Sequence, residues 1–435
     1  MDAAPPADGK PLADVSPATS DLAVLADGPQ EPPPPPVTTQ WTHLLGIGSS
    51  LLGNSIAADR AGNVYLAGPV SVALDGNAYA GTGDVFIAKY DSNGVKLWTR
   101  EMGGSLSDYG WAAATDPEGN AVVAGSTANS LDGSGNAGAM DILVVKYDPS
   151  GARLWTREMG TTTFDQANAV ATDPAGNVFV AGVTYGSLDG NASFGEGDLF
   201  VAKLDANGAT LWTRQLGSEA WDGATGAASD GAGNLYVAGY TRGSFDGHPS
   251  AGSDDVFVVK YDPNGDKVWS RQLGTSTTDS AHAIATDLSG NLYVVGETSG
   301  GLDGNASFGT TDAFVVKYDP SGGKQWSRQW GSLNSDVARA VATNTLGDVY
   351  VVGESLGNPD GWLGAGGADI FVLKYDSNGV ERGSLLKGTS HSDAANGLTI
   401  DQAGDIYMAG VTMGELDGNP NPSGTDLFLC KLTEL

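Results

Sequence analysis

Three features of the sequence predict an all-β fold, namely a seven-bladed β-propeller whose blades are four-stranded antiparallel sheets. The first is a strict 57-residue period, which is marked by Trp41, Trp98, Trp155, Trp212, Trp269 and Trp326. The second is that residues 37–435 hold seven units of this length with no insertion or deletion. The third is a composition of 64 glycines and 17% charged residues without a sustained helical period, which favours short strands and tight turns. A repeat of this length is one supersecondary unit, and seven four-stranded units can close into a ring.

Each unit contains four candidate strands, which are clearest in the second unit. Strand-like runs cover residues 96–102, 111–115, 121–124 and 142–147, and Gly- and Asp-rich turns separate them. We name the strands of a blade A to D from the axis outward. By analogy with related propellers we take the 111–115 strand as strand A, and its small residues such as Ala112 suit a position where seven blades crowd round the axis. The 121–124 and 142–147 strands follow as B and C, and a Trp-bearing strand lies outermost as D.

The two ends of the repeat array complete each other. The array begins with the Trp-bearing strand at residues 37–45 and ends after the strand at 426–432, so the first and last units are each incomplete. Pairing of these two strands would assemble a whole blade and remove two open sheet edges. We therefore expect a ring that is closed by the N-terminal strand and the C-terminal blade.

The first 36 residues differ in composition from the repeats. Residues 1–36 are rich in Ala, Pro and Asp and end in five prolines, so we expect a disordered linker with a polyproline stalk before the propeller at 37–435. The sequence shows no basic and then apolar leader, which leaves two alternatives: a cytoplasmic protein, or one whose leader is not in this sequence. An acidic, Pro-rich spacer favours the second. We expect a secreted or cell-surface protein, such as a lipoprotein.

Charge and cysteine content exclude several classes of function. Fifty-two acidic residues against 22 basic ones give a net charge of -30, which repels nucleic acid and anionic lipid. No apolar run is long enough to span a membrane. Cys430 is the single cysteine, and its column otherwise holds Ala, Val or Leu, which indicates a buried apolar residue. We expect a monomer without a cofactor, apart from the calcium considered below.

The repeat resembles the bacterial seven-bladed β-propeller repeat family, abbreviated SBBP. The resemblance rests on residues 176–182 (GNVFVAG), 188–191 (LDGN), 198–203 (DLFVAK) and 211–214 (LWTR), and on their equivalents across 37–435. It implies a secreted or cell-surface protein, and it transfers no catalytic residues because the family has no agreed activity. The departures from the pattern lie in and beside the terminal units: Gly383 replaces the Trp, Leu385 and His43 replace the Arg, and Leu51 replaces an Asp.

Three columns of aspartates, twenty residues in all, gather on the predicted rim that carries the long B-to-C loops and the D-to-A links. An Asp-Gly pair lies in the B-to-C loop of every unit, at Asp75, Asp132, Asp189, Asp246, Asp303, Asp360 and Asp417. A second aspartate begins strand C in every unit, at Asp84, Asp141, Asp198, Asp255, Asp312, Asp369 and Asp426. A third recurs in six D-to-A links, at Asp108, Asp165, Asp222, Asp279, Asp336 and Asp393.

Two interpretations of these carboxylates stay open. In the first, each aspartate accepts backbone N–H groups in its own turn and pairs with the Lys89 or Arg100 column, which braces a long loop. In the second, the Asp-Gly carboxylates and loop carbonyls bind Ca²⁺, which takes six to eight oxygen ligands. The sequence has neither EF-hand nor nonapeptide calcium spacing, and sevenfold recurrence is typical of structure, so we favour bracing.

Positions that differ between units indicate a binding site at the central mouth of this rim. One column near the start of strand A reads Asn54, Trp111, Asn168, Thr225, His282, Arg339 and Asn396, while its neighbours are small and uniform. Aromatic and polar residues lie close to it in sequence, at Tyr109, Phe164, Trp221 and His391, with Tyr185, Tyr240 and Arg242 after strand B. Varied polar and aromatic side chains round a mouth are typical of a site for a glycan, a peptide or a partner loop. The candidate ligand-binding residues are Tyr109, Trp111, Trp221, His282, Arg339 and His391.

Catalysis at the same mouth is the alternative hypothesis. His282 could act as a base and Arg339 could stabilise negative charge, because neighbouring blades would bring the two residues close together. The sequence contains no Ser-His-Asp set, phosphate loop or zinc motif, however. The sequence therefore favours a binding scaffold over a lyase or a hydrolase.

Overall fold

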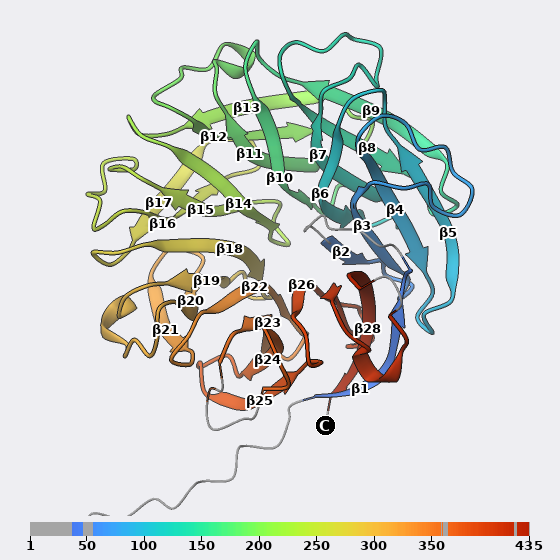
Figure 1. Cartoon of the computed structure of the whole chain (residues 1–435). Coiled ribbons are helices and arrows are strands. Elements are labelled where there is room, and N and C mark those ends of the chain that lie inside the picture. Colours follow the sequence, from blue (N-terminus) through green and yellow to red (C-terminus); the bar gives the residue numbers. More distant parts are fainter. Residues whose placement is uncertain (1–36, 47–54, 358, 360–363, 422–423, 435) are drawn as a thin grey trace, which may run out of the picture. The chain divides into compact units, whose positions relative to one another are not determined.

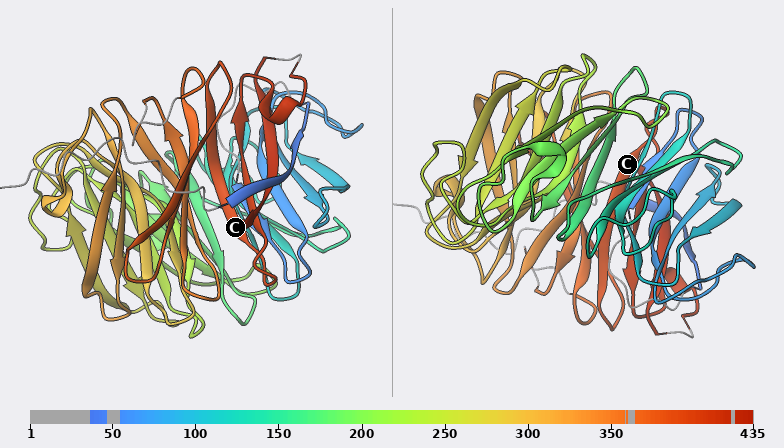
Figure 2. Two further views of the ribbon diagram at one scale, coloured as in Figure 1. Left: turned by 90° about the horizontal axis from the view of Figure 1, so that it is seen from below. Right: turned by 90° about the horizontal axis from the view of Figure 1, so that it is seen from above.

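The computed structural model of the chain describes residues 37–46, 55–357, 359, 364–421 and 424–434. The expected linker, residues 1–36, lies outside these residues. The described part is all-β, and its strands form seven four-stranded antiparallel sheets round a central axis, as the sequence predicts (Figure 1). Side views show the strands of the blades running between two rims of loops (Figure 2).

Each blade is a simple meander from the axis outward. Blades 1 to 4 comprise β2 (Ser55–Ala58), β3 (Val64–Val70), β4 (Asp84–Tyr90) and β5 (Lys96–Met102); β6 (Asp108–Thr115), β7 (Ala121–Thr127), β8 (Asp141–Tyr147) and β9 (Arg153–Met159); β10 (Asp165–Thr172), β11 (Val178–Thr184), β12 (Asp198–Leu204) and β13 (Thr210–Leu216); and β14 (Asp222–Ser229), β15 (Leu235–Thr241), β16 (Asp255–Tyr261) and β17 (Lys267–Leu273).

The remaining blades follow the same order. Blades 5 to 7 comprise β18 (Asp279–Thr286), β19 (Leu292–Thr298), β20 (Asp312–Tyr318) and β21 (Lys324–Trp330); β22 (Asp336–Thr343), β23 (Val349–Ser355), β24 (Asp369–Tyr375) and β25 (Glu381–Lys387); and β26 (Asp393–Ile400), β27 (Ile406–Thr412), β28 (Asp426–Glu434) and β1 (Val37–Leu44). Short 3₁₀ turns lie in three of the described B-to-C loops, at η1 (Leu188–Gly190), η2 (Leu302–Gly304) and η4 (Leu416–Gly418).

Two strands of blade 2 extend further than the sequence predicts. Strand β6 begins at Asp108 rather than Trp111, and β7 ends at Thr127 rather than Ala124. The reason is a side-chain bond at this end of the ladder, because Asp108 and Thr127 are register partners and the Thr127 hydroxyl donates to the Asp108 carboxylate. The same bond recurs in blades 3, 5 and 7, so an aspartate of the third column joins the start of strand A to the end of strand B in these blades.

The ring closes through the outer strand of blade 7. Strand β1 pairs antiparallel with β28, with Val37 opposite Glu434 and Leu44 opposite Phe428. The inner strand β26 of this blade lies beside β2 of blade 1, which completes the ring (Figure 1). This topology confirms the predicted closure by the N-terminal strand.

The hydrophobic core lies between neighbouring blades rather than inside any one of them. A typical layer packs Phe179 and Val201 of blade 3 against Val237 and Phe257 of blade 4. Strands B and C supply most of the fully buried residues, because both of their faces meet another blade. Cys430 is fully buried in the last such layer, where burial raises the pKa of its thiol, as expected for an apolar position.

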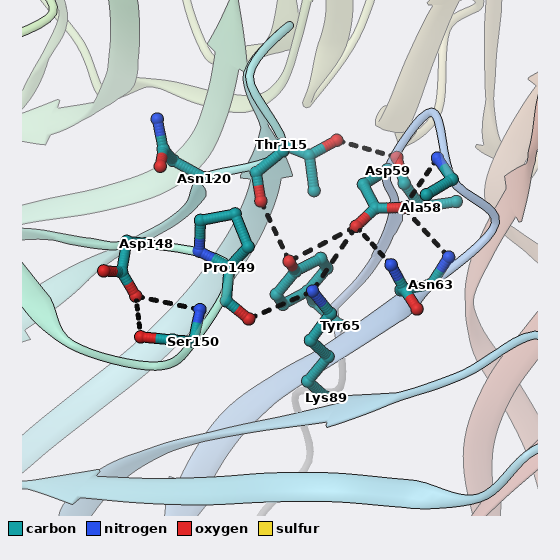
Figure 3. Close-up of polar contacts among 12 residues, drawn as sticks. Ala58, Asp59, Asn63, Tyr65, Lys89, Thr115, Asn120, Asp148, Pro149 and Ser150 are labelled. Atoms are coloured by element: carbon teal, nitrogen blue, oxygen red, sulfur yellow. Dashed lines mark hydrogen bonds and ion pairs between the residues drawn. The ribbon is translucent and has the colours of Figure 1, made fainter.

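The A-to-B and C-to-D turns form what we call the lower rim, and a repeated polar contact joins neighbouring blades there. In blade 1, Lys89 Nζ lies 3.6 Å from Asp59 Oδ2 and donates to the Pro149 carbonyl of blade 2 at 3.1 Å (Figure 3). Trp98 Nε1 donates to the same carbonyl at 3.1 Å. Arg100 Nε donates to the Gly151 carbonyl at 2.8 Å.

This geometry corrects one part of the bracing hypothesis. The Lys89 and Arg100 columns do not pair with the loop aspartates, because strands C and D carry both side chains to the opposite, lower rim. The lysine instead pairs with the aspartate of an A-to-B turn and holds the C-to-D turn of the next blade. We call this contact the lower-rim latch.

The latch explains two departures from the repeat. In blades 1 to 5 the tryptophan and arginine of strand D bind turn carbonyls 51 residues further along the chain. The blade that follows blade 6 has no C-to-D turn, because its strands β28 and β1 come from opposite ends of the chain. In blade 6, Gly383 replaces the tryptophan and Leu385 replaces the arginine, because no turn carbonyl of a following blade is present to accept their hydrogen bonds. Lys374 pairs instead with Asp348 and Glu434.

Candidate functional site

The central channel holds a cavity of about 580 Å³. It is lined at mid-height by the inner strands, and the variable column predicted from the sequence faces it with Trp111, Asn168, Thr225, His282, Arg339 and Asn396. Three of the six candidate ligand-binding residues, Trp111, His282 and Arg339, therefore line one cavity. Asn54 of the same column lies outside the described residues.

The smaller members of this ring bind the neighbouring inner strand. Asn168 Nδ2 donates to the Ala224 carbonyl at 2.9 Å, and Thr225 Oγ1 donates to the Ala281 carbonyl at 2.8 Å. Trp111 Nε1 and Asn396 Nδ2 are buried and have no hydrogen-bond partner among the described residues. Buried donors are normally paired, so these two N–H groups are available to an acceptor placed beside them.

Two glutamates that sequence reasoning missed give the channel its charge. His282 Nε2 lies 3.4 Å from Glu297 Oε1, and the Arg339 guanidinium pairs with the Glu354 carboxylate. The nearby His282 imidazole lowers the pKa of Glu297 and outweighs the opposing effect of burial. Both glutamates lie on strand B, in a column that also reads Pro69, Ser126, Val183, Tyr240 and Val411. That variability was the available clue.

The remaining candidates do not line the cavity. Tyr109 stacks on Trp111, with ring centroids 5.3 Å apart, and so supports the ring from the rim side. The exposed His391 lies beside Ser390, whose hydroxyl is 3.2 Å from His391 Nδ1. Trp221 belongs to a separate group on blades 3 and 4.

That separate group is an aromatic cluster on the B-to-C and D-to-A side, which we call the upper rim. Trp221 stacks on Tyr240 at 4.6 Å, and its Nε1 donates to the Tyr185 hydroxyl at 2.8 Å. Arg242 lies 5.7 Å from the centre of the Trp221 ring, and Phe164 meets Tyr185 edge to face. Most of the Trp221 ring is thus covered by its own neighbours.

The Asp-Gly aspartates brace their own loops in the structure. Asp75, Asp189, Asp246, Asp303 and Asp417 adopt left-handed backbone conformations, which aspartate tolerates better than most residues. Asp75 accepts from Lys96 Nζ at 2.7 Å and from Thr99 Oγ1 at 2.5 Å, both on strand D of its own blade. Ser or Thr makes the same bond to Asp189, Asp246 and Asp417. Asp360 lies outside the described residues.

The other two aspartate columns are buried at the upper rim. Asp84 Oδ2 accepts the Ala80 N–H at 2.9 Å, and Asp108 Oδ2 accepts the Gly104 N–H at 2.7 Å, so each carboxylate closes a loop. Both side chains are fully buried, and Asp84 Oδ1 has no hydrogen-bond partner in the described part of the chain. Over the same residues, no group of three or more His, Cys, Asp or Glu side chains is arranged to hold a metal ion.

Comparison with known proteins supports the repeat assignment. The family described as SBBP, a beta-propeller repeat, matches residues 40–68, 154–189 and 268–303. The Neurospora crassa Pan2 WD40 domain resembles 90% of the chain and 95% of its own length at a TM-score of 0.50 and 11% identity, which shows the fold alone. None of the described helices is long and apolar enough to cross a membrane.

Two curated proteins share sequence similarity with the chain. An uncharacterized WD repeat-containing protein, L264, of Acanthamoeba polyphaga mimivirus is 22% identical over 434 residues, which is 76% of this chain and 31% of that protein. The regulatory protein FlaEY of Caulobacter vibrioides is 32% identical over 170 residues, which is 36% of this chain and 18% of that protein. The chain thus spans less than a third of either relative. The protein is thus a seven-bladed β-propeller in which three segments match the SBBP repeat.

Proposed function

We propose that this propeller is a binding scaffold that takes a ligand in its central channel, which the ligand enters from the upper rim. The observation that carries the proposal is the irregular ring at mid-channel. Six polar or aromatic side chains of five types face a cavity of about 580 Å³, while the positions beside them are Ala, Gly, Val or Ile in most blades. A concave site with a few converging polar groups is the usual form of a ligand pocket.

The charges of the ring suit a glycan or a peptide rather than a polyanion. Arg339 and His282 each lie beside a glutamate, so among the described residues of the channel neither positive charge is left without a carboxylate. The free N–H groups of Trp111 and Asn396 would donate hydrogen bonds to ligand oxygens. We place the protein outside the cell or at its surface, a proposal that rests on the acidic composition and the Pro-rich first 36 residues.

The test is a binding screen with immobilised full-length protein against glycan and peptide libraries. A variant combining Trp111→Ala, His282→Ala and Arg339→Ala should lose the captured ligand, yet keep nearly the same melting temperature because these side chains line a cavity. Leu288→Ala, which alters an 84% exposed side chain on the lower rim, is the control and should bind normally. Equal binding by the triple variant and the control would refute the channel as the site.

The His282–Glu297 pair favours one second candidate, an enzyme that uses the same mouth. A carboxylate beside an imidazole fixes its orientation, as in many general bases. If ligands found in the screen are turned over, His282→Ala alone should abolish turnover, and Glu297→Gln should lower it and shift its pH profile. Turnover that is unchanged in His282→Ala would exclude this candidate.

A further inference from the structure

One half-buried position on strand D holds a glutamine or a glutamate in blades 1 to 5, and a leucine in blades 6 and 7. Blades 3, 4 and 5 carry a glutamine there, namely Gln215, Gln272 and Gln329. Blades 1 and 2 carry a glutamate instead, namely Glu101 and Glu158. The surrounding residues belong to the same repeat columns in all five blades. An amide and a carboxyl group can therefore be compared at equivalent positions within one molecule.

The glutamines use both ends of their amide. Gln215 Oε1 accepts the Leu188 N–H of the long loop at 3.1 Å. Its Nε2 donates to Asp198 Oδ2 at 2.8 Å and to the Gly186 carbonyl at 2.9 Å. Blades 4 and 5 repeat all three bonds, with Nε2 to carboxylate distances of 2.8 Å. The amide thus ties strand D to the loop and to the second aspartate column.

The glutamates reproduce only the accepting half of this pattern. Glu101 Oε1 accepts the Leu74 N–H, and Glu158 Oε1 accepts the Leu131 N–H. The second oxygen, Oε2, takes the role of the glutamine nitrogen, and in both residues it is buried without a hydrogen-bond partner in the described structure. In blades 1 and 2 the glutamate Oε2, an acceptor, therefore takes the place of the glutamine Nε2, which in blades 3 to 5 donates to the aspartate that corresponds to Asp84 or Asp141.

Carboxylates dominate the surroundings of both glutamates. Burial raises the pKa of Glu101, and Asp84 and Asp75 add to the rise. Lys96 is paired with Asp75, and Asp108 lies beside Asp84 from the next blade.

The second glutamate has similar neighbours. Burial raises the pKa of Glu158, and Asp132 and Asp141 add to it. Asp165 lies beside Asp141 from the next blade. Arg157 and Asp189 line the adjoining groove, but the Arg157 Nε donates to the Gly208 carbonyl at 2.6 Å.

We propose that Glu101 and Glu158 are protonated in the folded protein at neutral pH, and that each carboxylic O–H donates to the neighbouring aspartate of strand C. A protonated carboxyl group has one donor and one acceptor, so it can reproduce the glutamine bonds to the loop N–H and to the strand C aspartate, but not the second bond of Nε2 to the loop carbonyl. The buried Oε2 atom of each glutamate shares its site with a buried aspartate, and two carboxylates so placed ionise together only at a cost, which favours one of them keeping a proton. The upper rim of blades 1 and 2 is therefore a pH-sensitive latch, and blades 3 to 5 hold a pH-independent version of it.

The sign of the effect follows from linkage. A carboxyl group whose pKa is higher in the folded than in the unfolded state stabilises the fold fully below the unfolded value. That stabilisation is lost as the pH rises through the folded pKa, where ionised Glu101 and Glu158 repel their partners. The loops at 71–83 and 128–140 should then loosen first, because each glutamate holds one of them.

The experiment compares full-length wild type with the double variant E101Q/E158Q. At neutral pH, wild type should show the infrared carbonyl band of a protonated carboxylic acid, and the double variant should lack it. Calorimetry in buffers of different ionisation enthalpy should find about two more protons released on unfolding of wild type than of the variant. The converse variant, Gln215→Glu, should release about one more proton on unfolding than wild type, and the stability of the upper rim of blade 3 should become pH-dependent.

Two results would overturn the proposal. One is an absent acid band in wild type together with equal proton release by wild type and the double variant. The other is Ca²⁺ binding by wild type at neutral pH that E101Q/E158Q loses, since a cation would then bridge the carboxylates in place of a proton.

Discussion

The Lys146–Asp116 and Lys96–Asp75 pairs show how burial decides the value of one charge contact. Lys146 and Asp116 are each 2% exposed and 2.8 Å apart, whereas Lys96 and Asp75 are 44% and 42% exposed. Lys146→Met leaves the buried Asp116 carboxylate without its cation and should lower the free energy of unfolding by about 3–5 kcal/mol. Lys96→Met should cost at most about 1 kcal/mol. Urea unfolding of the two variants checks the difference, and equal losses would contradict it.

Asp116 also predicts a pH dependence. Burial raises the pKa of this carboxyl, but hydrogen bonds from Lys146 and Asn120 outweigh burial and hold the pKa below its ordinary value. The lowered pKa stabilises the fold at neutral pH, and this stabilisation is lost as the pH falls through the folded value. Asp116→Asn should therefore be less stable than wild type at pH 7, and the gap should narrow towards about pH 2. A gap that is constant with pH in urea titrations would refute this assignment.

At the scale of the element, the outer strand is stabilised by the turn of the next blade. Trp212 Nε1 donates to the Pro263 carbonyl at 3.3 Å, so Trp212→Phe should keep the packing and lose about 1 kcal/mol. Gly383→Trp should restore the repeat sequence but add no more than about 0.5 kcal/mol, because blade 7 has no C-to-D turn to accept its N–H. Chemical denaturation measures both changes. A large gain from Gly383→Trp would show that the missing carbonyl is not the reason for the glycine.

For the whole molecule, closure of the ring depends on the pairing of one strand, β1, with β28. Deletion of residues 37–46 removes the ladder between β1 and β28 and exposes Leu427 and Leu429, which are now 1% and 0% exposed. The melting temperature should fall sharply, since several ladder bonds at about 1 kcal/mol each and the burial of an apolar strand are lost together. A thermal melt that is unchanged by the deletion would contradict a closed ring.

Calcium dependence is likewise a property of the whole ring, because the Asp-Gly turn recurs in every unit. Lysine ammonium groups and Ser or Thr hydroxyls donate hydrogen bonds to the carboxylates of Asp75, Asp246 and Asp417, which would otherwise be the oxygen ligands of a calcium ion. We therefore expect equal melting temperatures in millimolar Ca²⁺ and in chelator. A saturated site would add about 2.7 kcal/mol at 100 times its dissociation constant, so a clear upward shift would favour the calcium interpretation instead.

The sequence by itself determined the number of blades, the strand order within them and the closure by residues 37–45. These properties follow from an uninterrupted period and from local strand and turn preferences, both of which can be read along one dimension. The variable column at Trp111, His282 and Arg339 was also visible, because it departs from an otherwise uniform repeat.

Only the tertiary structure decided which side chains meet between blades. The Lys89 column could not be assigned to the lower rim from sequence, because its turn partner lies 60 residues away in the neighbouring blade. Glu297 and Glu354 turn towards the channel because strand B pairs with strand A in a particular register. The missing donor beside Glu101 appears only when the blades are compared in space. Contacts across blades depend on register and burial, which the repeat period does not encode.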